Sequence, residues 1–228
     1  MNLHAAAAVG NLQEIVDLLR TYRIPRCKGV TGGASRNGHF ECLKYLHERG
    51  FPIDRFGSAG DAAKIGHLEM LQYVFTHGER ENVPGAAGIW ALRHSIKHIR
   101  CFKWILDANI TTQDEDRDVY ILIHAANEDF ATFAYFHHYV ADSKPEYLST
   151  FWKFSKTISK DFIEKIDLDD LQWRKDFLHV DLGTVQNSIL RNKISYLKGC
   201  QNACSELLQH YISTDVIQHI LFHYVSCK

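Results

Sequence analysis

Residues 38–50 read GHFECLKYLHERG, and residues 66–78, 28 positions further along the chain, read GHLEMLQYVFTHG. Both stretches begin with Gly-His, continue with an apolar residue and a glutamate, and end on glycine. Their apolar residues follow the spacing of one face of a helix. Repetition at a fixed spacing is typical of stacked arrays of small structural units. The sequence therefore predicts such an array, and with it a binding function.

The second residue of each stretch, His39 or His67, marks the start of a predicted helix. Apolar residues follow each mark at the first, fourth and seventh positions, which places all three on one helical face. The same pattern follows Asn11, His98 and Asp129, so the five marks are separated by 28, 28, 31 and 31 positions. The apolar residues are Leu12, Ile15 and Leu18; Phe40, Leu43 and Leu46; Leu68, Leu71 and Val74; Ile99, Phe102 and Ile105; and Phe130, Phe133 and Phe136.

Small residues precede most of the marks and predict a shorter helix ahead of each apolar one. Alanine favours a helix and lets neighbouring helices approach closely. We expect Gly38 and Gly66 to form the left-handed turn that ends the short helix. In the fourth unit Lys97 replaces this glycine, and Arg93 and His94 take the place of the alanine pair, which leaves the packing of that unit open. The small-residue stretches are residues 5–8, 34–35, 62–63 and 125–126.

This pattern resembles the ankyrin repeat. Units of 28 residues are shorter than the usual ankyrin length of about 33, and they lack its Thr-Pro-Leu-His start. They are most similar to the short ankyrin units of large DNA viruses and some microbial eukaryotes. The resemblance implies an all-α ankyrin-repeat solenoid of stacked helix-turn-helix units, about five of them over residues 1–141. It is carried by Ala62-Ala63, Gly66-His67-Leu68-Glu69, Leu71 and Gly78, with the parallel set in the unit before.

Residues 142–228 contain no clear repeat. Helical spacing continues through this part, and residues 183–199 faintly echo the first unit. We expect a divergent helical continuation, in which degenerate helix pairs extend the stack and end in a C-terminal cap. A separate helical domain is the alternative.

Composition bounds the function further. The chain has 228 residues, of which 46% are hydrophobic, and a net charge of −1, so we expect neither nucleic acid nor an anionic membrane as a partner. The sequence contains no apolar run long enough to cross a membrane. Its N-terminus is interpreted as the first repeat and not as a signal peptide. An intracellular, cytoplasmic location is expected, with free thiols and with Cys42 and Cys101 as small buried hydrophobes.

Sequence motifs give little support to a chemical function. Pairs spaced for one helix face, such as His94 with His98, Cys200 with Cys204 and His219 with His223, suggest a metal site. Against this, the chain lacks CxxC and HExxH motifs, a phosphate-binding loop and any framed nucleophile. The histidines at the marks are equally explained by bonds to neighbouring backbone. We therefore expect no enzyme activity, no cofactor and no metal.

The expected function is non-enzymatic binding of a protein partner by a monomer. The resemblance places partners on the side formed by the short helices and the loops before them. Exposed aromatic and arginine residues on that side would be the anchors. If the virus-like character of the repeats is correct, a host protein is the natural partner. Two basic segments, residues 18–40 and 82–106, lack acids and suggest an acidic partner. Solvated helix faces are the favoured explanation for most of these charges. The predicted partner-binding residues are Arg36, Phe56, Lys64, Trp90, Arg93 and His94.

A second interpretation concerns the segment STDVIQHILFHYV, residues 213–225. Its apolar rhythm is similar to the F-box-like helix with which some viral ankyrin proteins recruit a ubiquitin ligase. It lacks the usual Leu-Pro start of that helix. The segment predicts either such an adaptor function or a helix that caps the stack, and exposure of its apolar face distinguishes the two.

Overall fold

The computed structural model describes residues 2–79, 85–111, 115–153, 158–167, 170–178, 180, 183, 185 and 188–211. The chain divides into two compact units, Met1–Gln113 (unit 1) and Asp114–Lys228 (unit 2). All regular elements in the described ranges are helices, which confirms the all-α prediction. Within those ranges, no helix combines the length and the apolar character needed to cross a bilayer.

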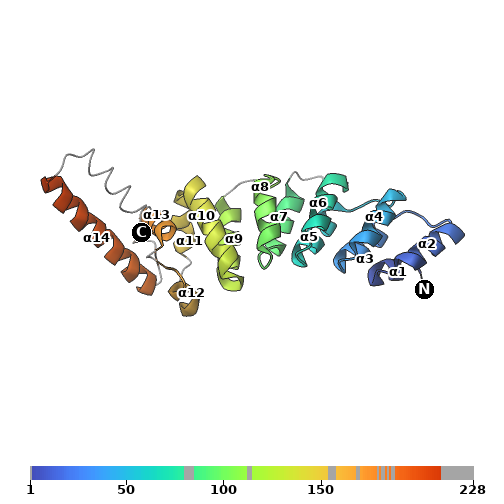
Figure 1. Ribbon diagram of the computed structural model, residues 1–228, viewed down its shortest axis with the longest axis horizontal. Coiled ribbons are helices and arrows are strands. Elements are labelled where there is room, and N and C mark those ends of the chain that lie inside the picture. The colour runs from blue at the N-terminus through green and yellow to red at the C-terminus, as the bar shows by residue number, and fades with distance from the viewer. Residues whose placement is uncertain are drawn as a thin grey trace. The chain divides into compact units, whose positions relative to one another are not determined.

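Unit 1 is a row of four helix pairs (Figure 1). The first helices of successive pairs pack on one another, α1 on α3, α3 on α5 and α5 on α7. The second helices also make contacts, α2 with α4 and α6 with α8. We refer to the two rows as the odd-numbered and even-numbered helices. The pairs are α1 (Leu3–Val9) with α2 (Leu12–Thr21), α3 (Lys28–Arg36) with α4 (Phe40–Glu48), α5 (Arg55–Lys64) with α6 (Leu68–His77), and α7 (Ala86–His94) with α8 (Ile99–Asp107).

The five predicted helix-start marks are all N-cap residues in the structure. Asn11, His39, His67 and His98 precede the even-numbered helices of unit 1, and Asp129 precedes α10 in unit 2. In the second to fifth sequence repeats, the fourth and seventh positions after the mark are fully buried, as the helical spacing predicts. These core residues are Leu43, Leu46, Leu71, Val74, Phe102, Ile105, Phe133 and Phe136.

Glycines with positive φ separate the helices of the first three pairs, as predicted. Gly38 and Gly66 have φ values of 78° and 75°. A second constraint acts at Gly66, because an added Cβ would lie 2.5 Å from the ring of His98. The Nε2–H of His98 donates to the carbonyl oxygen of Lys64 at 2.9 Å. One histidine thus contacts the turn of the pair before it and ties consecutive pairs together.

The first pair repeats this contact. A Cβ at Gly10 would lie 2.5 Å from the ring of His39, and the Nε2–H of His39 donates to the carbonyl oxygen of Ala8 at 3.1 Å. The mark histidine between these two behaves differently, since Nδ1 of His67 accepts from the backbone N–H of Met70 at 3.3 Å. The expectation that mark histidines bond to backbone is confirmed, and two of them bond across pairs.

The fourth pair lacks a turn glycine because its turn is longer. In α5 the fully buried pair is Ala62 and Ala63, and in α7 it is Ala91 and Leu92, 29 positions later. The following N-caps, His67 and His98, are 31 positions apart. Two additional residues therefore lie between the buried pair and the next helix. Placing Arg93 and His94 at the alanine-pair position was wrong, because these residues follow the buried pair.

Unit 2 holds the remaining helices. Helix α9 packs on α10 and α11, and α10 also contacts α11 and α13. The fifth predicted repeat, α9 with α10, thus shares a compact unit with helices beyond residue 141. Residues 188–199 of the segment that echoes the first repeat belong to a single long helix, α14. Residues 213–225, on which the adaptor interpretation depends, lie outside the described residues. The helices are α9 (Glu115–Glu128), α10 (Phe130–Ser143), α11 (Glu146–Trp152), α12 (Lys160–Glu164), α13 (Leu171–Leu178) and α14 (Ser188–Tyr211).

Candidate functional site

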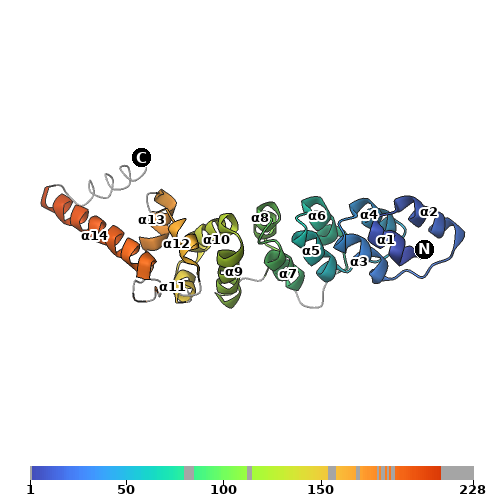
Figure 2. The same ribbon diagram turned by 90° about the horizontal axis from the view of Figure 1, so that it is seen from below.

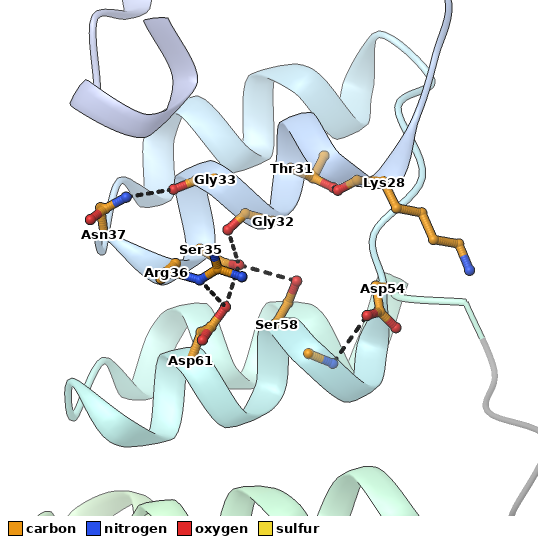
Figure 3. A network of polar contacts seen from close by, with 11 residues as sticks. Lys28, Thr31, Gly32, Gly33, Ser35, Arg36, Asn37, Asp54, Ser58 and Asp61 are labelled. Atoms are coloured by element: carbon orange, nitrogen blue, oxygen red, sulfur yellow. Dashed lines mark hydrogen bonds and ion pairs between the residues drawn. The ribbon is translucent and has the colours of Figure 1, made fainter. Parts of the chain in front are cut away.

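A polar cluster lies between α3 and α5 on the row of odd-numbered helices (Figure 3). The hydroxyl of Ser35 lies 3.2 Å from the hydroxyl of Ser58 and 3.4 Å from Oδ2 of Asp61. The exposed Arg36 approaches the same Asp61 oxygen to 4.0 Å. Burial raises the pKa of Asp61, while Arg36, Ser35, Lys64 and His94 oppose this effect. The Asp61 carboxyl group thus interacts with all four of these side chains.

A cavity of about 390 Å³ adjoins the cluster, and both Lys28 and Asp61 line it. Gly32 lines this cavity, and a Cβ added there would meet no atom within 4 Å. Lys28 is held by an ion pair with Glu79 at 2.5 Å. The surface between α3 and α5 is therefore open, and it is lined by both positively and negatively charged side chains.

Four side chains form a second cluster between α5 and α7. Phe56 stacks on Trp90 with ring centroids 5.4 Å apart and an interplanar angle of 18°. His94 meets the Trp90 ring edge-on at 4.4 Å, and the guanidinium of Arg93 lies 5.8 Å from its centroid. Phe56 remains 41% exposed. We call these four residues the aromatic platform.

The platform depends on a glycine in the neighbouring helix. A Cβ at Gly60 would lie only 2.3 Å from the indole of Trp90, so this ring rests directly on the backbone of α5. Trp90 lies in the middle of α7, which begins at Ala86. Its position between α5 and α7 brings it against Phe56.

The structure places the six residues predicted from the sequence in two clusters on the odd-numbered helices. Four of them form the platform. The other two, Arg36 and Lys64, are the last residues of α3 and α5, and both act on the Asp61 carboxyl group. By the 29-residue spacing of the buried pairs, Arg93 is the counterpart of Lys64 in α7. Three consecutive odd-numbered helices therefore carry a basic residue at equivalent places.

Sequence reasoning missed Asp61, Ser35 and Ser58. The signal for Asp61 was available, because it is the only acid in the small-residue stretch GSAGDAAK, residues 57–64. An isolated charge among alanines and glycines of a packing helix needs a partner. The serines gave no such signal, since serine is common in short helices and turns.

Unit 2 contains a buried cluster of His137, His138 and Asp176. The Nδ1 atoms of His137 and His138 lie 2.8 Å and 2.5 Å from the same Asp176 oxygen. Gln172 donates to the other Asp176 oxygen at 3.1 Å. His137 and Asp176 are almost fully buried, and the ring of Trp173 lies 4.9 Å from the ring of His137. Two helices, α10 and α13, are thus joined through one carboxylate.

The donor set of this cluster is one that metal ions use, and its donor atoms lie within 4.8 Å of one another. A histidine nitrogen and a carboxylate oxygen bound to one tetrahedral zinc ion lie roughly 3.3 Å apart, given Zn–N and Zn–O distances of about 2.0 Å. The contacts of 2.5 and 2.8 Å have instead the length of hydrogen bonds from ring N–H groups to a carboxylate. We therefore describe the cluster as a hydrogen-bonded element of the core.

Burial and hydrogen bonding set the ionisation of this cluster. Burial lowers the pKa of His137, and its hydrogen bond to Asp176 offsets only part of this effect. Burial by itself raises the pKa of Asp176, but hydrogen bonds from His137 and His138 outweigh it and bring the pKa down to about 2. The folded cluster therefore holds a neutral His137 against an ionised Asp176.

Acid should destabilise unit 2 in two steps. Below pH 6.5, His137 takes up a proton in the unfolded chain but remains neutral in the folded chain. Between pH 3.8 and about pH 2, Asp176 is likewise protonated in the unfolded chain but remains ionised in the folded chain. Each group lowers the free energy of unfolding by about 1.4 kcal/mol per pH unit within its window. Urea unfolding followed by fluorine NMR of 5-fluorotryptophan measures this, because Trp152 and Trp173 report on unit 2. A His137→Phe variant that retains the slope just below pH 6.5 would contradict the first step.

No protein-family model matches the chain, and no curated protein matches it. We therefore infer function from the chain's own residues and from the repeat pattern described above.

Proposed function

We propose that the chain is a non-enzymatic protein-binding module built as an ankyrin-like solenoid. The helix pairs of unit 1, with odd-numbered helices packed on one another, support this fold assignment. Stacked pairs form a rigid surface that loses little conformational entropy when a partner binds. Such a protein needs no catalytic group, only a few well-placed anchors.

The observation that carries the proposal is the aromatic platform. Phe56 and Trp90 come from different helices and stack on each other, and Phe56 stays accessible. Aromatic and arginine side chains dominate the energetics of protein interfaces, because they bury a large area at a small entropic cost. Arg93 over Trp90 adds a cation to the same surface. This combination supports a partner that inserts an apolar side chain beside an acidic one.

Charge along the odd-numbered helices supports the same kind of partner. Arg36, Lys64 and Arg93 occupy equivalent places on α3, α5 and α7. Cations in a line favour the approach of an acidic protein segment and align it along the row. Asp61 limits the net charge, which disfavours nonspecific binding to polyanions such as nucleic acid.

Of the three free cysteines whose side chains the structure describes, two support a non-enzymatic function, and the third, Cys27, is exposed. Cys42 and Cys101 are buried and free. Burial raises the pKa of Cys101 to about 11 and also raises that of Cys42. A thiol that stays protonated is a weak nucleophile. These residues are the small buried hydrophobes that the sequence predicted.

A comparison of two variants tests the proposal. Phe56→Ala removes the accessible half of the stacked pair and should weaken partner binding about tenfold to thirtyfold. Tyr196→Ala is the control, because it removes an exposed aromatic side chain from unit 2. Both variants and the wild type would be immobilised and their captured proteins quantified by mass spectrometry. A protein lost selectively with Phe56→Ala would then be purified and titrated calorimetrically.

The proposal requires a partner whose affinity falls with Phe56→Ala and changes less than about twofold with Tyr196→Ala. Thermal melting of each variant establishes that unit 1 is folded. If every captured protein binds the folded Phe56→Ala variant as well as the wild type, the platform is not the binding site.

A further inference from the structure

Three arginines surround a pocket at the start of unit 1, away from the aromatic platform. Arg23 and Arg26 come from the connection between α2 and α3, and Arg49 follows the last residue of α4. Figure 2 shows this connection as a loop that leads from α2 back to α3. The pocket has a volume of about 630 Å³, within the range of small-ligand sites. Its walls include the apolar side chains of Leu19 and Ile24, and no acidic residue lines it.

Backbone geometry builds this pocket. Residues 22–27 form a connection without helix, in which Pro25 fixes one φ angle. The chain then turns sharply at Gly50, whose φ is 86°. A Cβ at Gly50 would lie 3.2 Å from the guanidinium carbon of Arg26, so this guanidinium lies against the turn that follows Arg49 in the chain. Buried Phe51 follows the turn and lines the pocket.

The described residues do not neutralise the charge of the pocket by ion pairs. Within the described part of the chain, none of the three arginines makes an ion pair. Arg49 lies over the ring of Tyr45 at 4.9 Å, which orients it without cancelling its charge. Cations nearby are treated differently, since Lys28 pairs with Glu79 and Arg36 approaches Asp61. Like charges held together repel one another, and a bound anion removes that repulsion.

We propose that this pocket binds a phosphate monoester whose organic part lies against the apolar wall. A phosphate group carries close to two negative charges and accepts several hydrogen bonds, which matches the planar fork of each guanidinium. The wall formed by Leu19, Ile24 and Phe51 can cover an apolar or aromatic group attached to the phosphate. Inorganic phosphate uses only the arginines and should bind more weakly.

Titrations with phenyl phosphate and inorganic phosphate test the proposal. Binding would be followed by nitrogen-15 NMR of the whole chain at an ionic strength of about 0.15 M, where nonspecific attraction is screened. Phenyl phosphate should shift the signals of residues 19–26 and 49–51 and bind at least about tenfold more tightly than inorganic phosphate. Equal affinities, or no shifts at about 5 mM phenyl phosphate, would overturn the proposal.

Two arginines of the same basic stretch give a matched pair of variants. Arg23→Gln removes a charge from the pocket and should weaken phenyl phosphate binding about tenfold or more. Arg20→Gln removes a charge from the exposed end of α2, does not line the pocket, and should change the affinity less than about twofold. Arg49→Gln serves as a second pocket variant. If Arg20→Gln weakens binding as much as the pocket variants, the attraction is nonspecific and the proposal fails.

Two further probes identify the source of the phosphate. Tighter binding of a phosphotyrosine peptide than of adenosine monophosphate assigns the pocket to a phosphorylated protein segment, and the reverse order assigns it to a free nucleotide. Either order supports a phosphate-ester site. Phe56→Ala should leave phenyl phosphate binding unchanged, because Phe56 does not line this pocket. The phosphate site and the protein-binding platform can therefore fail independently.

Discussion

Asp176→Leu should lower the free energy of unfolding of unit 2 by about 3–5 kcal/mol. The substitution removes the carboxylate to which both His137 and His138 donate, and it leaves the fully buried ring of His137 without its hydrogen bond. Nε2 of His137 has no hydrogen-bond partner among the described residues, so the bond to Asp176 is the only hydrogen bond of the ring within them. Urea unfolding monitored at Trp152 and Trp173 measures the change.

Removing both members of the pair should cost less than the two single changes together. His137→Phe leaves the Asp176 carboxylate buried with one ring donor fewer, and we expect a loss of about 2–3 kcal/mol. In the double variant no fully buried ring is left unpaired and no partly paired carboxylate remains, and only the partly exposed ring of His138 has lost its partner. The coupling energy should therefore be about 1–3 kcal/mol. Asp142→Leu, which replaces an exposed acid of α10, should change stability by less than about 0.5 kcal/mol. Additive single effects would show that the two residues do not act as a pair.

The repeat pattern explains why unit 1 was predictable. Each mark fixes the phase of one helix, and from the second repeat on this phase is enough to predict the burial of the fourth and seventh positions after the mark. In the first repeat Ile15 is buried, but Leu18 is only half-buried. The turn glycines were predictable for the same reason, because a left-handed residue between two helices excludes most side chains. The prediction failed at the fourth turn, where an insertion shifted α7 against α8 and moved Arg93 out of the alanine-pair position.

The pairings in unit 2 could not be predicted. His137 and Asp176 are 39 positions apart, and beyond residue 142 no repeat fixes which helix faces another. The candidate surfaces of unit 1 could be predicted in part, because the sequence shows their residues but not which of them become neighbours. The basic run containing Arg23 and Arg26 is visible in the sequence, whereas the approach of Arg49 requires the turn at Gly50. The sequence predicted Phe56 and Trp90 as separate binding residues, and only the contact between α5 and α7 makes them neighbours.

Contacts between consecutive pairs determine how rigid a stacked array is, since each pair is stabilised mainly by its neighbours. In unit 1 the odd-numbered helices supply small-residue packing, exemplified by Trp90 lying on Gly60. The mark histidines add hydrogen bonds near the turns. His98 contacts the turn between α5 and α6. This turn follows α5, the helix that carries Phe56 of the aromatic platform. A fault at this turn should therefore loosen the proposed binding surface as well as the fold.

Gly66→Ala should destabilise unit 1 by about 2–4 kcal/mol, whereas Gly38→Ala should cost only about 1 kcal/mol. Both glycines have nearly the same positive φ, so the backbone penalty is common to them. At Gly66 the new methyl group would lie 2.5 Å from the ring of His98 and would break its bond to the Lys64 carbonyl. At Gly38 it would meet only the end of the Ile65 side chain, at 3.1 Å, which can move aside. Urea unfolding of each variant measures the difference.

His98→Ala separates the two contributions at this turn. Alone it should cost about 1–2 kcal/mol through the lost hydrogen bond and ring contact. Combined with Gly66→Ala it removes the clash, so the double variant should be more stable than the sum of the single losses predicts by at least about 1 kcal/mol. Gly10→Ala with His39→Ala repeats the comparison at the first turn, where the same ring-to-glycine contact occurs. If Gly66→Ala and Gly38→Ala prove equally costly, the turns are limited by backbone conformation alone, and the histidine does not hold consecutive pairs together.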